Sequence, residues 1–326
     1  MASANTNYSD ILATTIESRS RKVADNVTNN NAFLKKMEMK GKVKTFSGGT
    51  KILQELSFAE NSNAGWYSGY DILPVGVTDT ISAAEYEIKQ AAVPVIISGL
   101  EQLQNAGRER MIDLMDARLS VAESTMANLI STGLYSDGSA ANNKQIDGLD
   151  KALPIDPTAA PYGGIDGGTY GFWTNQVSNQ TAANGLDPTK IQGYWNELWA
   201  SQVRGADRPD LILCDSTVWA AYTASLQALQ RFSSPDVGNL GFPTLKFMDA
   251  DVVLDGGIGG ACPAGTAFFL NTNYMHYRPH SARNMVPLSP NRRYATNQDA
   301  EVQILAWAGN LTCSGRQFPG RVDAVG

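Results

Sequence analysis

The longest helical pattern in the sequence lies at residues 98–132, and it constrains the fold more than any other segment does. Apolar side chains recur there at intervals of three and four residues, which is the spacing of one face of a helix. Ser98 and Glu101 form a capping box at the start, and Gly133 is a stop signal at the end. At a rise of about 1.5 Å per residue the helix would be roughly 50 Å long. Such a rod is longer than a compact domain needs, so we expect it to act as a spine.

Residues 42–97, ahead of that helix, favour extended structure. Ile52, Leu56 and Phe58 alternate with other residues at a period of two, and turn-rich stretches such as NSNAGWYSGYD separate the predicted strands. An isolated two-stranded excursion is marginal in water, because it buries little apolar surface. We therefore expect this segment to lean on a neighbouring chain.

Residues 1–41 are polar and rich in asparagine, with a short apolar pattern near Ile11. The segment holds no second half of a hydrophobic core, so we expect it to be an arm that lies on something else. Its start lacks the apolar stretch of a signal peptide. The candidate inter-subunit contacts from the arm and the extended segment are Trp66, Tyr67, Tyr70, Ile52, Leu56, Phe58, Ile11 and Phe33. For the three turn aromatics, packing within the loop itself is the alternative.

Beyond residue 186 the pattern alternates between helices and strands. Asp187 and Pro188 have the residue types of a helix N-cap and first turn, and Asp215 is placed to cap a second helix. The predicted strands are 211–214, 245–254, 266–270 and 301–313. Residues 134–186 are rich in glycine, alanine, asparagine and proline, but their aromatic residues favour local packing. The fold class that follows is α+β, with a last strand that returns far from the first.

Charge is distributed unevenly along the chain. The net charge is −6, yet residues 1–45 carry eight Lys and Arg against four acidic residues. An acidic body does not bind nucleic acid through its bulk surface, whereas a basic arm can touch a polyanion or an acidic neighbour. A solvated polar segment is the alternative. The candidate DNA-facing residues of the arm are Arg19, Arg21, Lys22, Lys35 and Lys36.

The residues that could carry catalysis or bind a metal are few and poorly spaced. The three cysteines, Cys214, Cys262 and Cys313, lie far apart and form no C-x-x-C pair, which favours buried reduced thiols. The only histidines are His276 and His280, with Pro279 between them, so they cannot share a helical face. We expect no enzymatic activity, no metal site and no cofactor.

Two further patterns resemble ligand sites but lack the residues that such sites need. Asp249, Asp251 and Asp255 lack the glycine and the terminal glutamate of a calcium loop, so we expect them to cap turns. The glycine-rich run at 256–260 matches no phosphate-binding motif. No stretch approaches eighteen consecutive apolar residues, so no membrane span is predicted.

The order of these elements resembles the major capsid proteins of tailed bacteriophages, whose shell fold is shared with herpesvirus capsid floors and encapsulins. Four stretches carry the resemblance. They are PYGGIDGGTYGFWTNQV (161–177), RPDLILCDSTVWAAY (208–222), LKFMDADVVLD with PAGTAFFLNTNYMHYRP (245–279), and QILAWAGNLTCSGRQFPGRV (303–322).

The resemblance implies a division of the chain into an arm, a loop and two domains. These are an N-terminal arm (1–41), an extended loop (42–97), a peripheral domain (98–139 and 296–326, with the spine helix at 98–132) and an axial domain (140–295). It also implies that the loop lies over the adjacent subunit and that the arm reaches another one.

The function that the resemblance implies is structural: self-assembly as hexamers and pentamers into an icosahedral head around double-stranded DNA. The implied partners are copies of the same chain, a portal, a cementing protein and weakly held DNA, with no membrane. No long charged prodomain precedes the arm, which favours a separate scaffolding protein. The implied location is the virion, after assembly in the bacterial cytoplasm.

Three alternatives to a phage head remain at this point. An encapsulin-like compartment would have the same fold and would enclose protein instead of DNA. A hydrolase would use Cys214 with His276 or His280. A minor virion protein, such as a decoration or tail component, would form no closed shell.

Overall fold

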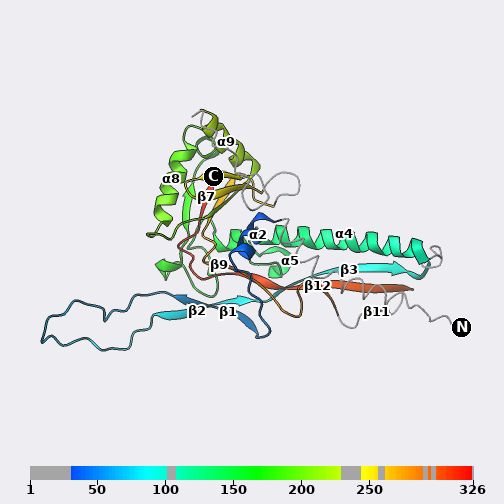
Figure 1. Ribbon diagram of the computed structural model, residues 1–326, viewed down its shortest axis with the longest axis horizontal. Helices are drawn as coiled ribbons and strands as arrows, with labels where there is room; N and C mark the ends of the chain where they lie inside the picture. Colours follow the sequence, from blue (N-terminus) through cyan, green and yellow to red (C-terminus); the bar gives the residue numbers. More distant parts are fainter. Residues whose placement is uncertain are drawn as a thin grey trace.

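The computed structural model is α+β, as the sequence predicts, and consists of two sheets, a long hairpin and a long helix (Figure 1). It describes residues 31–100, 108–228, 244–255, 261–288, 293–294 and 299–324. The long helix, α4 (Arg108–Leu134), and the hairpin extend in opposite directions along the longest axis of the molecule.

A six-stranded mixed sheet forms one end of the body. Its strands, in spatial order, are β4 (Gln176–Asn179), β13 (Gly320–Asp323), β8 (Thr266–Leu270), β5 (Leu211–Cys214), β7 (Ala250–Leu254) and β6 (Thr244–Phe247). Helices α8 (Ile191–Gln202) and α9 (Ser216–Ala228) pack against it around Trp195. The Trp195 ring stacks on Tyr222 with 4.5 Å between centroids and meets Phe269 edge-on at 5.2 Å. Aromatic packing of this kind gives the sheet a core of its own.

A five-stranded sheet is organised on one long central strand, β12 (Ala300–Cys313). Strand β3 (Lys89–Ser98) pairs along one edge of β12. Along the other edge lie β11 (Arg293–Tyr294), β10 (Val286–Pro287) and β9 (Met275–Pro279). Helix α4 packs on this sheet and contacts β3. The sheet and α4 together form the elongated half of the molecule (Figure 1).

The hairpin pairs β1 (Lys51–Ser57) with β2 (Ile81–Glu87) in antiparallel register from Lys51 opposite Glu87 to Ser57 opposite Ile81. Residues 58–80 connect the two strands and extend beyond the body (Figure 1). Short elements complete the described chain: α5 (Ala140–Asn143), α6 (Leu149–Ala152), the 3-10 turn Gly171–Trp173 and α7 (Ala182–Gly185).

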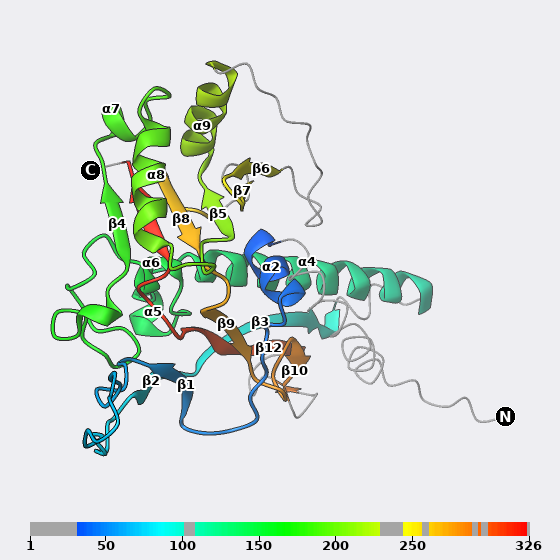
Figure 2. The same cartoon turned by 60° about the vertical axis from the view of Figure 1, so that its left-hand side comes forward.

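Helix α2 (Ala32–Met39) lies at the joint between the two sheets. Figure 2 shows it below the strands of the six-stranded sheet and above β9 and β12. Asn31 caps the helix by accepting a hydrogen bond from the Leu34 backbone N–H at 3.1 Å. Phe33, Leu34 and Met37 are all but fully buried.

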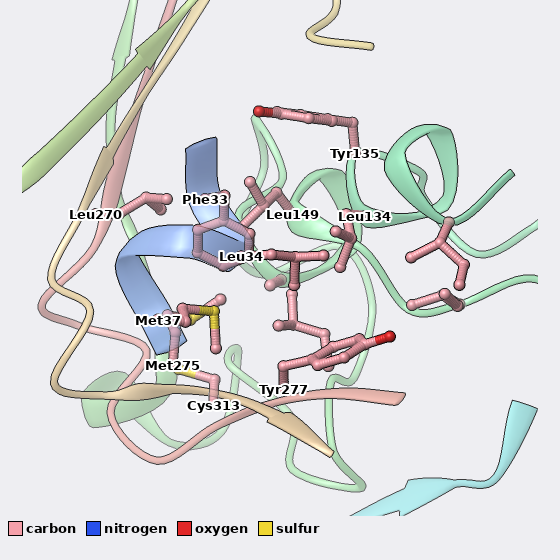
Figure 3. Packing of buried hydrophobic residues seen from close by; sticks show 14 of the residues in the cluster. Phe33, Leu34, Met37, Leu134, Tyr135, Leu149, Leu270, Met275, Tyr277 and Cys313 are labelled. Atoms are coloured by element: carbon pink, nitrogen blue, oxygen red, sulfur yellow. The ribbon is translucent and has the colours of Figure 1, made fainter. Parts of the chain in front are cut away.

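Those three side chains of α2 join one apolar cluster with residues from both sheets and from the end of α4 (Figure 3). The cluster includes Leu270 from β8, Tyr277 from β9 and Leu134 from α4. The six-stranded sheet, the five-stranded sheet and α4 therefore share a core through α2.

Several predicted elements are confirmed. The strands at 211–214, 266–270 and 301–313 correspond to β5, β8 and β12. Asp215 caps α9, because its carboxylate accepts from the Thr217 backbone N–H at 3.2 Å. The same carboxylate also accepts from the Gly265 N–H at 3.1 Å, which ties the helix start to the loop before β8.

Three predicted boundaries are wrong. Gly133 does not stop the spine helix, which continues to Leu134. Asp187 accepts from the Thr189 N–H at 2.9 Å and so stabilises a turn, and the helix begins at Ile191. Residues 245–254 form two strands, β6 and β7, because Met248 turns the chain with a φ of 52°. Glu101 of the predicted capping box and the glycine-rich run at 256–260 lie outside the described residues.

None of the helices within the described ranges combines the length and the apolar character that a bilayer-spanning segment requires.

We predict that Phe33→Ala lowers the free energy of unfolding of the isolated subunit by about 3–4 kcal/mol, because it leaves a cavity in the shared core. Met39 lies on the same helix but is exposed, so Met39→Ala is the matched control and should change stability by less than about 0.5 kcal/mol. Chemical denaturation of the two variants measures the difference. Equal effects would show that α2 does not join the sheets.

Candidate assembly surfaces

The root of the hairpin is fixed to the body by buried contacts. Ile52 and Leu56 of β1 and Tyr86 of β2 are buried. The Tyr86 hydroxyl donates to the Cys313 carbonyl at 3.0 Å and accepts from the Cys313 N–H at 3.2 Å. Two hydrogen bonds to the central strand β12 thus hold the hairpin at one angle to the five-stranded sheet.

Gly163 allows the root to approach the loop that contains residues 161–177. Its φ of +62° is in the left-handed region, and a Cβ there would lie 3.0 Å from Ala84 and from the Tyr86 ring. The Gly163 carbonyl accepts from the Glu85 backbone N–H at 2.9 Å. A larger residue at this position would push the hairpin away from the body.

A buried arginine, Arg316, supports the same loop from beneath. Its side chain donates to the carbonyls of Ala152 at 2.8 Å and Trp173 at 3.1 Å, and its guanidinium lies 5.5 Å from the Tyr162 ring centroid. Burial lowers the pKa of Arg316. Sequence reasoning missed this residue; the arginine in the SGRQF segment near the C-terminus was the available signal.

The connection between the hairpin strands presents its apolar side chains to solvent. Relative exposure is 106% for Trp66 and 105% for Tyr70, and Tyr67 is also exposed. The shape of the connection comes from polar contacts instead: the Asn63 side chain donates to the Gly76 carbonyl at 2.6 Å, and Asp71 accepts from the Ser68 N–H at 2.8 Å. The three turn aromatics therefore do not pack within the loop.

Other side chains predicted to contact a neighbouring subunit are instead covered by residues of their own chain. Ile52, Leu56 and Phe33 lie in the shared core, because long-range partners cover them. Phe58 is half-buried and lies 5.7 Å from the Phe172 ring. Ile11 lies outside the described residues.

The basic residues of the arm that the structure describes are engaged within the subunit. Lys36 pairs with Asp251 at 2.6 Å and Lys40 with Asp210 at 2.7 Å, so both lysines tie α2 to the six-stranded sheet. Lys35 is half-buried on the same helix. Arg19, Arg21 and Lys22 lie outside the described residues.

The cysteines and histidines considered for catalysis are either buried or hydrogen-bonded to the backbone. Cys214, Cys262 and Cys313 are free and buried, as predicted, and burial raises the pKa of the Cys214 thiol. Burial, with Lys42 and Lys44 nearby, lowers the pKa of His276 to about 4. The Nδ1 of His280 accepts from the Ala282 N–H at 3.1 Å.

The three aspartates considered for calcium binding have separate partners. Asp249 pairs with Arg208 at 2.7 Å, Asp251 pairs with Lys36, and Asp255 accepts from the Tyr135 hydroxyl. Ion pairs and one hydroxyl therefore hold the three carboxylates. The expectation that these residues cap turns fits Asp249 alone, because Asp251 and Asp255 do not lie in turns. Within the described ranges, no group of three or more His, Cys, Asp or Glu residues is placed to hold a metal ion.

Comparison with known proteins finds similarity at the level of the fold. No protein-family model and no curated protein sequence matches the chain. The capsid of cyanophage A-1(L) superposes with a TM-score of 0.61 at 16% identity, over 89% of this chain and 93% of that one. The capsid of a native GTA particle gives 0.60 at 12% identity, covering 89% and 90%. The holo-SrpI encapsulin of Synechococcus elongatus PCC 7942 gives 0.50 at 9% identity, covering 89% and 87%.

These similarities cover about nine-tenths of each chain, so the shared fold extends over most of this sequence. The fold is the shell fold of phage capsid subunits, which an encapsulin shares. The resemblance that the order of sequence elements indicated is confirmed for the fold.

We predict that the buried His276 makes the subunit less stable in mild acid. Its pKa is lowered from 6.5 to about 4 in the folded state, so between these values the unfolded chain takes up the proton and the folded chain does not. Stability should therefore fall as the pH drops from 6.5 to 4, by up to about 3 kcal/mol from this group alone.

Urea unfolding at a series of pH values measures this effect. His276→Gln should flatten the dependence, whereas His280→Gln, which changes the chain's other histidine, should leave it as in the wild type. Identical slopes for all three proteins would contradict the role given to burial of His276.

Proposed function

We propose that this chain is the major capsid protein of a tailed bacteriophage, a structural subunit and not an enzyme. In this proposal it assembles as hexamers and pentamers into an icosahedral head that encloses double-stranded DNA. The observation that carries the proposal is the combination of a shell fold over about nine-tenths of the chain with a rigidly rooted hairpin whose aromatic tip is exposed and is not covered by any described residue of its own subunit. An exposed apolar patch of this kind marks a protein-interaction site.

The proposed division of the chain follows from the same reasoning. Residues 1–41 form the arm, 42–97 the extended loop, 98–139 with 296–326 the peripheral domain, and 140–295 the axial domain at the centre of each capsomer. Within 42–97, the reaching part is the hairpin at 51–87, because β3 pairs with β12 in the five-stranded sheet. The hairpin would lie over the adjacent subunit, with Trp66, Tyr67 and Tyr70 as its anchors.

Contacts between neighbours in this arrangement are heterologous, because the tip of one subunit meets a different surface of the next. Such contacts close into rings when the rotation between subunits divides a full turn. Further partners would be a scaffolding protein, a portal and a cementing protein. The capsid would assemble in the bacterial cytoplasm, and this chain would then be part of the virion.

Electron microscopy of the protein expressed in bacteria, alone and with its neighbouring phage genes, tests the proposal. Wild-type protein should form capsomer rings or closed shells. The double variant Trp66→Ser and Tyr70→Ser should stay unassembled while its thermal unfolding matches that of the wild type, because both side chains are exposed in the subunit. A wild-type protein that stays monomeric under every condition would contradict the proposal.

An encapsulin-like compartment is the second candidate, because the structural likeness includes an encapsulin. Both candidates predict closed shells, so the contents decide between them. Shells purified from cells that express the phage packaging proteins should contain DNA if the chain is a capsid protein. Shells that enclose protein cargo and exclude DNA would favour the compartment.

The arm provides a separate prediction about the DNA. Lys36 is paired with Asp251 within the subunit, so the cations that we propose for weak phosphate contacts are Arg19, Arg21 and Lys22. Filled shells that lack residues 1–22 should release DNA at lower salt than complete shells do. Equal retention across the salt series would contradict a DNA-facing arm.

A further inference from the structure

A cationic face forms where the segment that follows α2 runs beside β9 (Figure 2). The Tyr277 N–H donates to the Lys42 carbonyl at 3.2 Å, and the Lys44 N–H donates to the Tyr277 carbonyl at 3.0 Å. Val43 is therefore the parallel neighbour of Tyr277, and both side chains pack on the shared core. Because side chains alternate between the two faces of a sheet, Lys42 and Lys44 lie on the opposite face.

Two residues of β9, His276 and Arg278, flank Tyr277 and so lie on that same face. Neighbouring strands are about 4.8 Å apart, and alternate residues of one strand are roughly 6.6 Å apart. Lys42 and Lys44 on one strand and His276 and Arg278 on the next thus form a patch two residues wide and two residues long. We call these four residues the cationic patch. Lys44 is exposed, so the patch is open to solvent at that position.

The charge of the cationic patch is not balanced within the part of the chain that the structure describes. No ion pair joins Lys42, Lys44 or Arg278 to a described carboxylate. Burial and the neighbouring Lys44 and Lys40 lower the pKa of Lys42. Burial, Lys42, Lys44 and Arg278 lower the pKa of His276. The charged groups that act on these two residues are therefore all cations, although the whole chain has a net charge of −6.

Two buried polar atoms of the cationic patch have no hydrogen-bond partner among the described residues. They are Nδ1 of His276 and Nε of Arg278. The other side chains on this face beside His276 are uncharged: Thr312, its neighbour on β12, donates to the Gln54 side chain of β1 at 3.3 Å. Buried polar atoms in native proteins nearly always have a partner. Unpaired polar atoms among uncompensated cations point to an anionic acceptor.

We propose that the cationic patch binds a phosphate group, either in a nucleic acid backbone or as free phosphate. Lysine amino groups supply compact positive charges, and the arginine guanidinium supplies a planar fork that matches phosphate oxygens. A phosphate dianion presents oxygens in several directions to groups from two strands, and it would offset the repulsion among the cations. The patch is separate from the arm residues at 19–22, and the inference does not rest on the proposed shell function.

Titration calorimetry of the free subunit with inorganic phosphate tests the assignment. The buffer is mildly alkaline, so that the dianion predominates, and sodium chloride keeps the ionic strength constant. We expect saturable binding to the wild type. The double variant Lys42→Gln and Lys44→Gln should bind about tenfold more weakly or less, because it loses two charged donors. The matched control, Lys144→Gln with Lys246→Gln, removes the same charge from exposed positions elsewhere and should keep the wild-type affinity.

Nuclear magnetic resonance of the wild type locates the binding without any substitution. The ring signals of His276 should shift with phosphate at the same midpoint as the calorimetric titration. Unchanged His276 signals at saturating phosphate, no saturable binding, or equal weakening in both double variants would overturn the assignment and leave the proposed function standing.

A short DNA duplex then separates the two sources of phosphate. Displacement of bound phosphate by the duplex would identify the nucleic acid backbone as the ligand, whereas phosphate binding that the duplex does not disturb would identify free phosphate. Either result supports a phosphate site. Tighter binding of a triglutamate peptide than of phosphate would show that the patch is a carboxylate site and would overturn the proposal.

Discussion

Burial of one face of α2 between the two sheets is the interaction on which the rest of the structure depends. Phe33, Leu34 and Met37 fill the space where β8 of one sheet, β9 of the other and the end of α4 converge (Figure 3). Packed cores are close to crystalline in density, so a filled joint holds its parts at a defined angle. The ion pairs of Lys36 and Lys40 with aspartates around the six-stranded sheet constrain the same helix from outside. In a shell, the angle held at this joint would set how each subunit meets its neighbours.

The hairpin shows the opposite balance of burial along its length. Its root is covered by the same chain, where Tyr86 bonds to β12 and Gly163 permits close approach. Its tip keeps aromatic and aliphatic side chains in water, and only polar contacts shape it. A rigid root with an uncovered tip costs little conformational entropy when a partner binds, because the direction of the hairpin is already fixed. The subunit thus has a buried core of its own and exposes apolar side chains at the hairpin tip.

The sequence predicted the elements whose pattern is local. The spine helix and β12 follow from their apolar periods. For the aromatic residues of the tip, the sequence left packing within the loop as an alternative, and the structure exposes all three side chains. The errors lie where the cause is distant or conformational. Met248 adopts a positive φ between β6 and β7, which its residue type does not signal, and only the adjacent Asp249 is a typical turn residue. Ile52 and Phe33 are predicted at a subunit interface but lie in the core of the subunit. The sequence does not reveal this burial, because the residues that cover them lie far away along the chain. Arg316 donates hydrogen bonds to backbone carbonyls of the loop near the hairpin root. Those carbonyls lie more than a hundred residues away in sequence, so no local pattern indicates the contact.

Hydrogen–deuterium exchange on the free subunit and on assembled shells tests most directly whether the joint around α2 is buried in the free subunit while the hairpin tip is covered only on assembly. We predict that amides in α2, β9 and β12 exchange slowly in both states, because residues of the same chain bury the joint. We also predict that amides in residues 58–80 exchange fast in the free subunit and become protected only in shells. Protection of 58–80 in the free subunit, or fast exchange there in closed shells, would contradict the claim that assembly completes the hairpin.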